Sequence, residues 1–115
     1  MDERLSKALE FANYSVTLNN QRQALKEKFL ADIIYYHNGG CFAVTKELIN
    51  FVKTLIDTGN EEGVVLIDDN DVPIEIADMQ NFLETILNKY FTASNEYYTE
   101  YQKIRKQRSV EGITQ

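Results

Sequence analysis

Apolar residues recur at helical spacing near both ends of the chain. From Asp2 to about Asn38 they include Leu5, Ala8, Phe11, Leu18, Leu25, Phe29, Ile33 and Tyr36. From Asp78 onward they include Met79, Leu83, Ile86, Tyr90, Ala93, Tyr97, Tyr101 and Ile104. The pattern predicts two long helices, with Asp78 as the N-cap of the second and residues 109–115 as a C-terminal tail.

A shorter helix is predicted between the two long ones. The segment His37-Asn38-Gly39-Gly40 ends the first helix, because glycine and asparagine tolerate the left-handed conformation found at helix C-termini. Residues 41–44 then form a short strand. Thr45 is the natural N-cap of a helix with a broad apolar face, which ends near residues 58–60.

Two β-branched apolar runs meet at an acidic turn within residues 64–76. This arrangement predicts a β-hairpin. With Asp69-Asn70 as a two-residue loop, Ile67 faces Val72, and the branched side chains at alternate positions share one side of the ribbon.

The hairpin needs further strands, because a two-stranded ribbon is marginally stable alone. Pro73 has no N–H to donate and marks an edge of the sheet, so residues 41–44 are the expected third strand. The predicted fold is α+β, in the order α-β-α-β-β-α. Two long helices and one shorter helix pack on a small three-stranded antiparallel sheet, in a single domain of residues 1–108.

The composition narrows the classes of function. The 115 residues carry 18 acidic and 12 basic side chains, a formal net charge of −6, which disfavours nonspecific binding to nucleic acid or to an anionic membrane. No apolar run approaches the roughly 20 residues that span a bilayer. The single cysteine is compatible with a reducing compartment, so we expect a soluble, cytoplasmic protein.

The long helices are the expected interaction surface. A first helix of this length has apolar residues that the remaining chain cannot cover, which favours a homo-oligomer or a protein partner. The second helix becomes rich in tyrosine, whose apolar ring and polar hydroxyl suit either a half-buried core position or an interface. The candidate interface residues are Tyr90, Tyr97, Tyr98, Tyr101, Phe11 and Leu18.

A basic run follows the tyrosines, formed by Lys103, Arg105, Lys106 and Arg108. Cations near a helix C-terminus complement the helix dipole. The alternative is a basic contact surface for an acidic partner.

No residue pattern in the chain indicates catalysis, a cofactor or a metal. The acidic turn lacks the glycine and glutamate spacing of an EF-hand, since Ile74 and Gln80 occupy those positions. His37 and Cys41 cannot supply the four ligands of a structural zinc site, and Gly39-Gly40 lacks the lysine of a phosphate-binding loop. We therefore expect a non-enzymatic protein.

Residues 42–48 resemble the first strand and following helix of winged-helix DNA-binding domains. The resemblance ends there, because the chain passes from Ile56 to the hairpin without a helix for the major groove. The acidic tip would also repel phosphate. A nucleic-acid-associated transcription regulator is thus the alternative to a protein-binding module.

Residues 51–56, 64–76 (Val-Val-Leu-Ile-Asp-Asp-Asn-Asp-Val-Pro-Ile-Glu-Ile) and 97–111 resemble small uncharacterised proteins of T4-like phages of marine cyanobacteria. This resemblance implies a viral origin and carries no activity or catalytic residue. It favours a role in virion assembly, in scaffolding or in control of a host protein. The location would then be the host cytoplasm or the virion.

Overall fold

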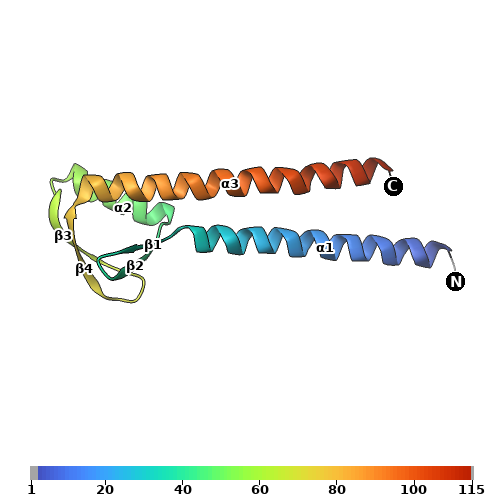
Figure 1. Ribbon diagram of the computed structural model, residues 1–115, viewed down its shortest axis with the longest axis horizontal. Coiled ribbons are helices and arrows are strands. Elements are labelled where there is room, and N and C mark those ends of the chain that lie inside the picture. Colours follow the sequence, from blue (N-terminus) through green and yellow to red (C-terminus); the bar gives the residue numbers. More distant parts are fainter. Residues whose placement is uncertain (1–2, 115) are drawn as a thin grey trace. The chain divides into compact units, whose positions relative to one another are not determined.

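The computed structural model describes residues 3–114, with side chains from residue 3 to residue 106. This part of the chain is α+β and contains three helices and two separate two-stranded antiparallel sheets (Figure 1). In chain order the elements are α1 (Glu3–Asp32), β1 (Ile34–His37), β2 (Gly40–Ala43), α2 (Lys46–Asp57), β3 (Glu62–Ile67), β4 (Pro73–Asp78) and α3 (Met79–Thr114). The segment 109–114, expected as a tail, continues α3.

The chain divides into two compact units, which are described separately. The sheet unit comprises Phe29–Asn95 and holds both hairpins, α2, the end of α1 and the first half of α3. The helical unit comprises the described parts of residues 1–28 and 96–115, which belong to α1 and α3.

The first helix is shorter than its apolar spacing predicted. α1 ends at Asp32, and residues 34–37 form β1 in place of a further helical turn. Asn38 and Gly39 adopt left-handed conformations, with φ of 48° and 79°, as a type I′ hairpin turn requires at both central positions. The residues expected to stop a helix therefore connect β1 to β2.

The predicted three-stranded sheet is wrong. Within the described residues β2 pairs with β1, β4 pairs with β3, and no backbone ladder joins the two hairpins. The outer edge of β2 is taken up by the turn between β3 and β4. The N–H of Cys41 donates to Asp68 Oδ2 and the N–H of Ala43 donates to Asp69 Oδ2, each at 2.9 Å. The N–H of Asp69 donates in return to the carbonyl oxygen of Cys41 at 2.9 Å.

The predicted register of the second hairpin is also wrong, by one residue. Asp68 N–H donates to the Val72 carbonyl at 2.9 Å, so the loop has three residues, and its last, Asp71, is left-handed with φ of 61°. Ile67 consequently faces Pro73. A one-residue slip exchanges the two faces of a strand.

The corrected register decides which side chains of the hairpin are buried. Leu66, Ile74 and Ile76 face the core, whereas Val65 and Ile67 are 58% and 61% exposed. On β3 the covered side is therefore the opposite of the predicted one, whereas Ile74 and Ile76 of β4 lie on the covered side, as the sequence predicts.

Asp68 holds this turn and joins it to the first hairpin. Asp68 as a residue is only 5% exposed. Oδ1 accepts the N–H groups of Asn70 and Val72 at 2.9 and 2.8 Å, while Oδ2 accepts that of Cys41. The bonds from Cys41 and then Val72 lower the pKa of Asp68 against the opposing effect of burial, and the bond from Asn70 lowers it further.

The sheet unit has one hydrophobic core. Its buried members are Ile33, Phe42, Val44, Val52, Ile56, Leu66, Ile74, Ile76, Met79, Phe82, Leu83, Ile86 and Ala93. Gly40 allows the hairpins to approach, because a Cβ there would lie 2.6 Å from Cγ1 of Ile74. The side chain of Asn38 adds a further link by donating to the carbonyl oxygen of Glu75 at 3.1 Å.

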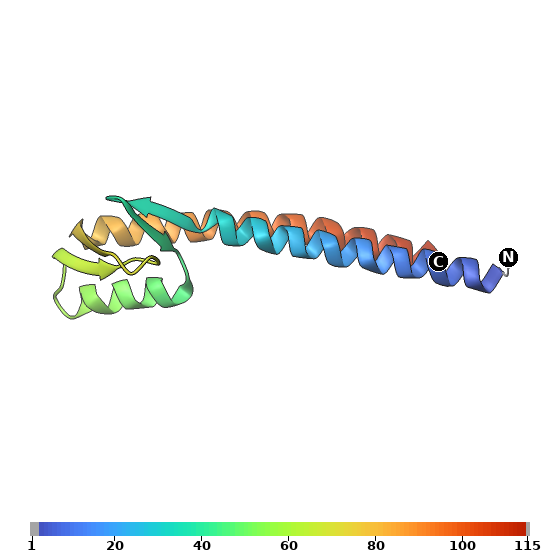
Figure 2. The same ribbon diagram turned by 90° about the horizontal axis from the view of Figure 1, so that it is seen from below.

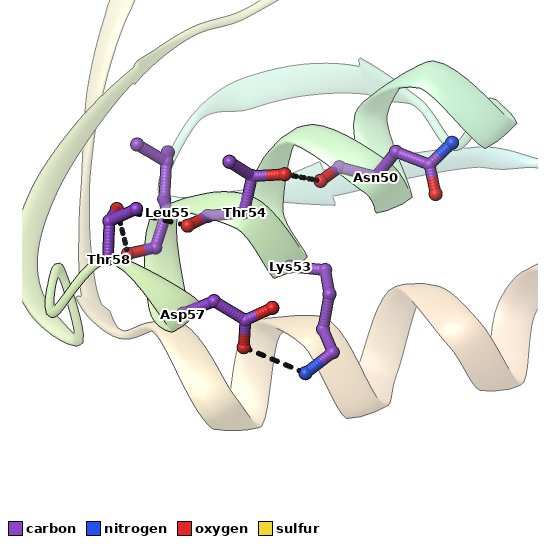
Figure 3. A network of polar contacts seen from close by, with 6 residues as sticks. All are labelled: Asn50, Lys53, Thr54, Leu55, Asp57 and Thr58. Carbon is purple, nitrogen blue, oxygen red and sulfur yellow. Dashed lines mark hydrogen bonds and ion pairs between the residues drawn. The ribbon is translucent and has the colours of Figure 1, made fainter.

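Both predicted helix caps in this unit are confirmed. Thr45 is extended and its hydroxyl accepts the N–H of Leu48, while Asp78 accepts the N–H of Asn81 at the start of α3. Figure 3 shows the last turns of α2, where the Thr58 hydroxyl bonds to the carbonyl oxygens of Thr54 and Leu55, beside the ion pair of Lys53 with Asp57. The helix ends at left-handed Gly59 (φ of 94°), where the N–H groups of Gly59 and Asn60 bond to the carbonyl oxygens of Ile56 and Leu55.

Acid should weaken the sheet unit through Asp68. A lowered pKa in the folded state means that the stabilisation is complete above the ordinary carboxyl pKa, 3.8 for Asp68, and is lost as the pH falls through the lowered value. The urea midpoint of the wild type should therefore fall more steeply below about pH 4 than that of Asp68→Asn, which cannot titrate. Equal slopes for the two proteins would contradict this role of the carboxylate.

Candidate protein-binding surfaces

In the helical unit α1 and α3 run side by side in opposite directions (Figures 1 and 2). The Lys28 ammonium lies 2.8 Å from Oε1 of Glu96, and the Arg22 guanidinium lies 5.8 Å from the centre of the Tyr101 ring. Leu18 of α1 is buried. One face of α1 is therefore used to pack against α3.

A second apolar face of α1 is not used in this way. Leu5, Leu9 and Val16 are 52%, 48% and 57% exposed. At about 100° per residue these three side chains fall within about 40° of one another, and Leu18 lies about half a turn from Leu9. We call Leu5, Leu9 and Val16 the outer stripe. It is an aliphatic surface on the side of α1 directed away from α3.

The candidate interface residues do not form one surface. In the helical unit Leu18 is buried and Tyr97 and Tyr101 are half-buried, with ring centres 6.5 Å apart. Phe11 and Tyr98 are exposed. The buried and half-buried residues therefore fit a packing role within the helical unit, whereas the exposed Phe11 and Tyr98 are accessible to a partner.

Tyr90 belongs to the sheet unit. It is half-buried against the core, and its ring meets that of Phe29 edge to face at 6.0 Å. Its contacts are those of a core residue.

The basic run lies on α3 in the helical unit. Lys103 pairs with Glu100 at 2.9 Å, whereas Arg105 and Lys106 are exposed. The side chain of Arg108 lies outside the described residues. The helical unit has a formal charge of +2, while the sheet unit, with 11 acidic and 3 basic residues, has −8. The charge of the chain is thus concentrated in the sheet unit.

His37 and Cys41 do not share a cleft. Tyr36 is opposite Cys41 in the register and His37 is opposite Gly40, so their side chains point to different faces of the hairpin. The His37 ring packs against Phe82, with centres 5.4 Å apart, and its Nδ1 lies 3.2 Å from the Tyr35 hydroxyl. This arrangement gives the imidazole a packing role.

The acidic turn has a structural use that the sequence reading missed. The carboxylates of Asp68 and Asp69 accept backbone N–H groups. In the described part of the chain no three histidine, cysteine, aspartate or glutamate side chains gather as metal ligands would. The three acids were visible in the sequence, but two of the donors they accept, the N–H groups of Cys41 and Ala43, belong to the other hairpin.

Comparisons with known protein families, with characterised proteins and with solved structures find no match for this chain. Among the described residues, no helix has the length and apolar character needed to cross a membrane. Exposed aliphatic side chains gather on the outer stripe and on the exposed side of β3.

Packing of α1 on α3 should depend on buried aliphatic residues more than on ion pairs. Leu18→Ala should destabilise the helical unit by about 2 kcal/mol. Lys28→Ala should cost about 0.5 kcal/mol or less, because both ends of its ion pair with Glu96 are half-exposed. Amide hydrogen exchange along α1 would measure both effects. A larger loss of protection in Lys28→Ala than in Leu18→Ala would contradict this ranking.

Proposed function

We propose that the chain is a non-enzymatic protein–protein interaction module that self-associates through the outer stripe of α1. The supporting observation is the exposure of Leu5, Leu9 and Val16 on one side of a helix whose opposite side is already packed. An amphipathic helix with a second apolar stripe commonly buries it against another helix. A second copy supplies such a helix.

The charge distribution favours the helical unit as the contact region. Two copies that met through their sheet units would bring together two regions of formal charge −8 each. The helical unit, at +2, imposes much less repulsion. Lys7 and Glu3, an i,i+4 pair near the stripe, add charges of both signs.

The phage resemblance of the sequence suggests the setting. A self-associating module suits virion assembly or scaffolding, and it also suits contact with a host protein. The alternative of a nucleic-acid-associated regulator draws support from the exposed Arg105 and Lys106. Against this alternative, the sequence between Ile56 and the second hairpin has no helix that could enter the major groove, as a winged-helix domain requires.

Charge placed on the outer stripe should abolish self-association. In the double variant Leu9→Glu, Val16→Glu, the introduced glutamates favour the helix, but their charges prevent burial of the outer stripe in an interface. Light scattering coupled to size-exclusion chromatography should give an oligomer for the wild type at tens of micromolar and a monomer for the double variant. Circular dichroism should show unchanged helicity.

Thr17→Glu is the matched control, since Thr17 is exposed on a different side of α1. This variant should associate like the wild type. A wild type that stays monomeric, or a double variant that associates normally, would refute self-association through the stripe.

A further inference from the structure

The outer edge of β3 differs from the outer edges of β2 and β4. The outer edge of β2 is bonded to Asp68 and Asp69. The outer edge of β4 contains Pro73, which has no N–H, and its Glu75 carbonyl accepts the Asn38 side chain. Charged residues, prolines and covering contacts are the usual ways in which proteins block strand edges. β3 has none of these between residues 63 and 67.

The backbone of β3 offers hydrogen-bonding groups along this edge. Asp68 and Val72 form a hydrogen-bonded pair, so by alternation Leu66 and Val64 bond to β4 while Val65 and Ile67 direct their N–H and C=O groups outward. Among the described residues, no bond from another element reaches the outward groups of Val65 or Ile67. Their side chains are also exposed.

Acidic side chains flank this apolar edge at both ends. Glu61 and Glu62 precede it, Asp71 follows it, and all three are exposed. Glu75, opposite Val65 in the register, is exposed on the same face. Neither hairpin contains a lysine or an arginine. A ligand for the edge must therefore be apolar in its middle and positive at its ends.

We propose that the outer edge of β3 binds an extended segment of another protein, apolar in its centre and flanked by lysine or arginine, which adds to the hairpin as a third strand. Main-chain bonds to Val65 and Ile67 supply the register, and apolar side chains cover the exposed side of the strand. The cations meet Glu62 at one end and Asp71 at the other.

A second copy of this chain does not suit the edge. Pairing of two β3 strands would join two units of charge −8. The chain's own basic run, Lys103 to Lys106, is helical within α3 and cannot add as a strand. The occupant is therefore a different protein.

A peptide of sequence Lys-Lys-Val-Thr-Val-Thr-Val-Lys-Lys tests this site on the full chain. NMR titration should shift the amide signals of Val65 and Ile67, and binding should weaken steeply with salt. A peptide with glutamate in place of lysine should not bind. A peptide N-methylated at its valines loses the main-chain N–H groups that face β3 and should bind about tenfold more weakly.

Variants of the protein complete the test. Val65→Pro removes one outward N–H without removing a ladder bond and should weaken binding about tenfold, whereas Val65→Thr keeps the N–H and should bind like the wild type. If Val65→Pro disturbs the fold, the N-methylated peptide still tests whether main-chain hydrogen bonds to β3 carry the binding. Equal binding of the methylated peptide, shifts confined to α3, or dissociation of an oligomer by Val65→Pro would each overturn the proposal.

Discussion

The arrangement of the sheet unit depends on the carboxylate of Asp68. It accepts N–H groups from its own turn, at Asn70 and Val72, and from a strand of the other hairpin, at Cys41. A buried carboxylate is stable only when such donors replace water. The same group therefore sets the loop length of one hairpin and fixes the position of the other.

The bonds of the Asp68 carboxylate have two consequences for the rest of the sheet unit. The three-residue loop sets the register of β3 against β4, which directs Leu66 and Ile74 into the core and leaves Val65 and Ile67 exposed. The turn also occupies the edge of β2, so the two hairpins are joined by the bonds of Asp68 and Asp69 in place of a continuous ladder. The exposure of Val65 and Ile67 on β3 follows from the register that this loop sets.

Local signals in the sequence were sufficient for the existence of the three helices and of the second hairpin, but not for the end of α1 or the register of the hairpin. Thr45 and Asp78 cap helices as their residue types predict, and the apolar periodicity placed α2 and the two long helices. Asn38-Gly39 was ambiguous, because the same left-handed conformations end helices and form type I′ turns. The spacing of Phe29, Ile33 and Tyr36 fits a helix, and only pairing with β2 shows that it ends earlier.

The candidate surfaces were harder to predict for the same reason. Exposure of Val65 depends on the register, and the register depends on the three-residue loop that Asp68 closes with Asn70 and Val72. The same carboxylate also accepts the N–H of Cys41, 27 positions away in sequence. Of the outer stripe, the apolar periodicity in the sequence had picked out only Leu5, and not Leu9 or Val16. Contacts such as that of Arg22 with Tyr101 are needed to decide which of the two apolar faces of α1 packs against α3.

Amide hydrogen exchange at Cys41 and Ala43 tests whether the carboxylates of the acidic turn hold the two hairpins together. If the carboxylates of Asp68 and Asp69 cap the edge of β2, both amides should be protected in the wild type. Cys41 should then lose protection in Asp68→Asn and Ala43 in Asp69→Asn, while the amide of Phe42, which bonds to β1, stays protected. Rapid exchange of Cys41 and Ala43 in the wild type, or protection that neither variant reduces, would contradict the account.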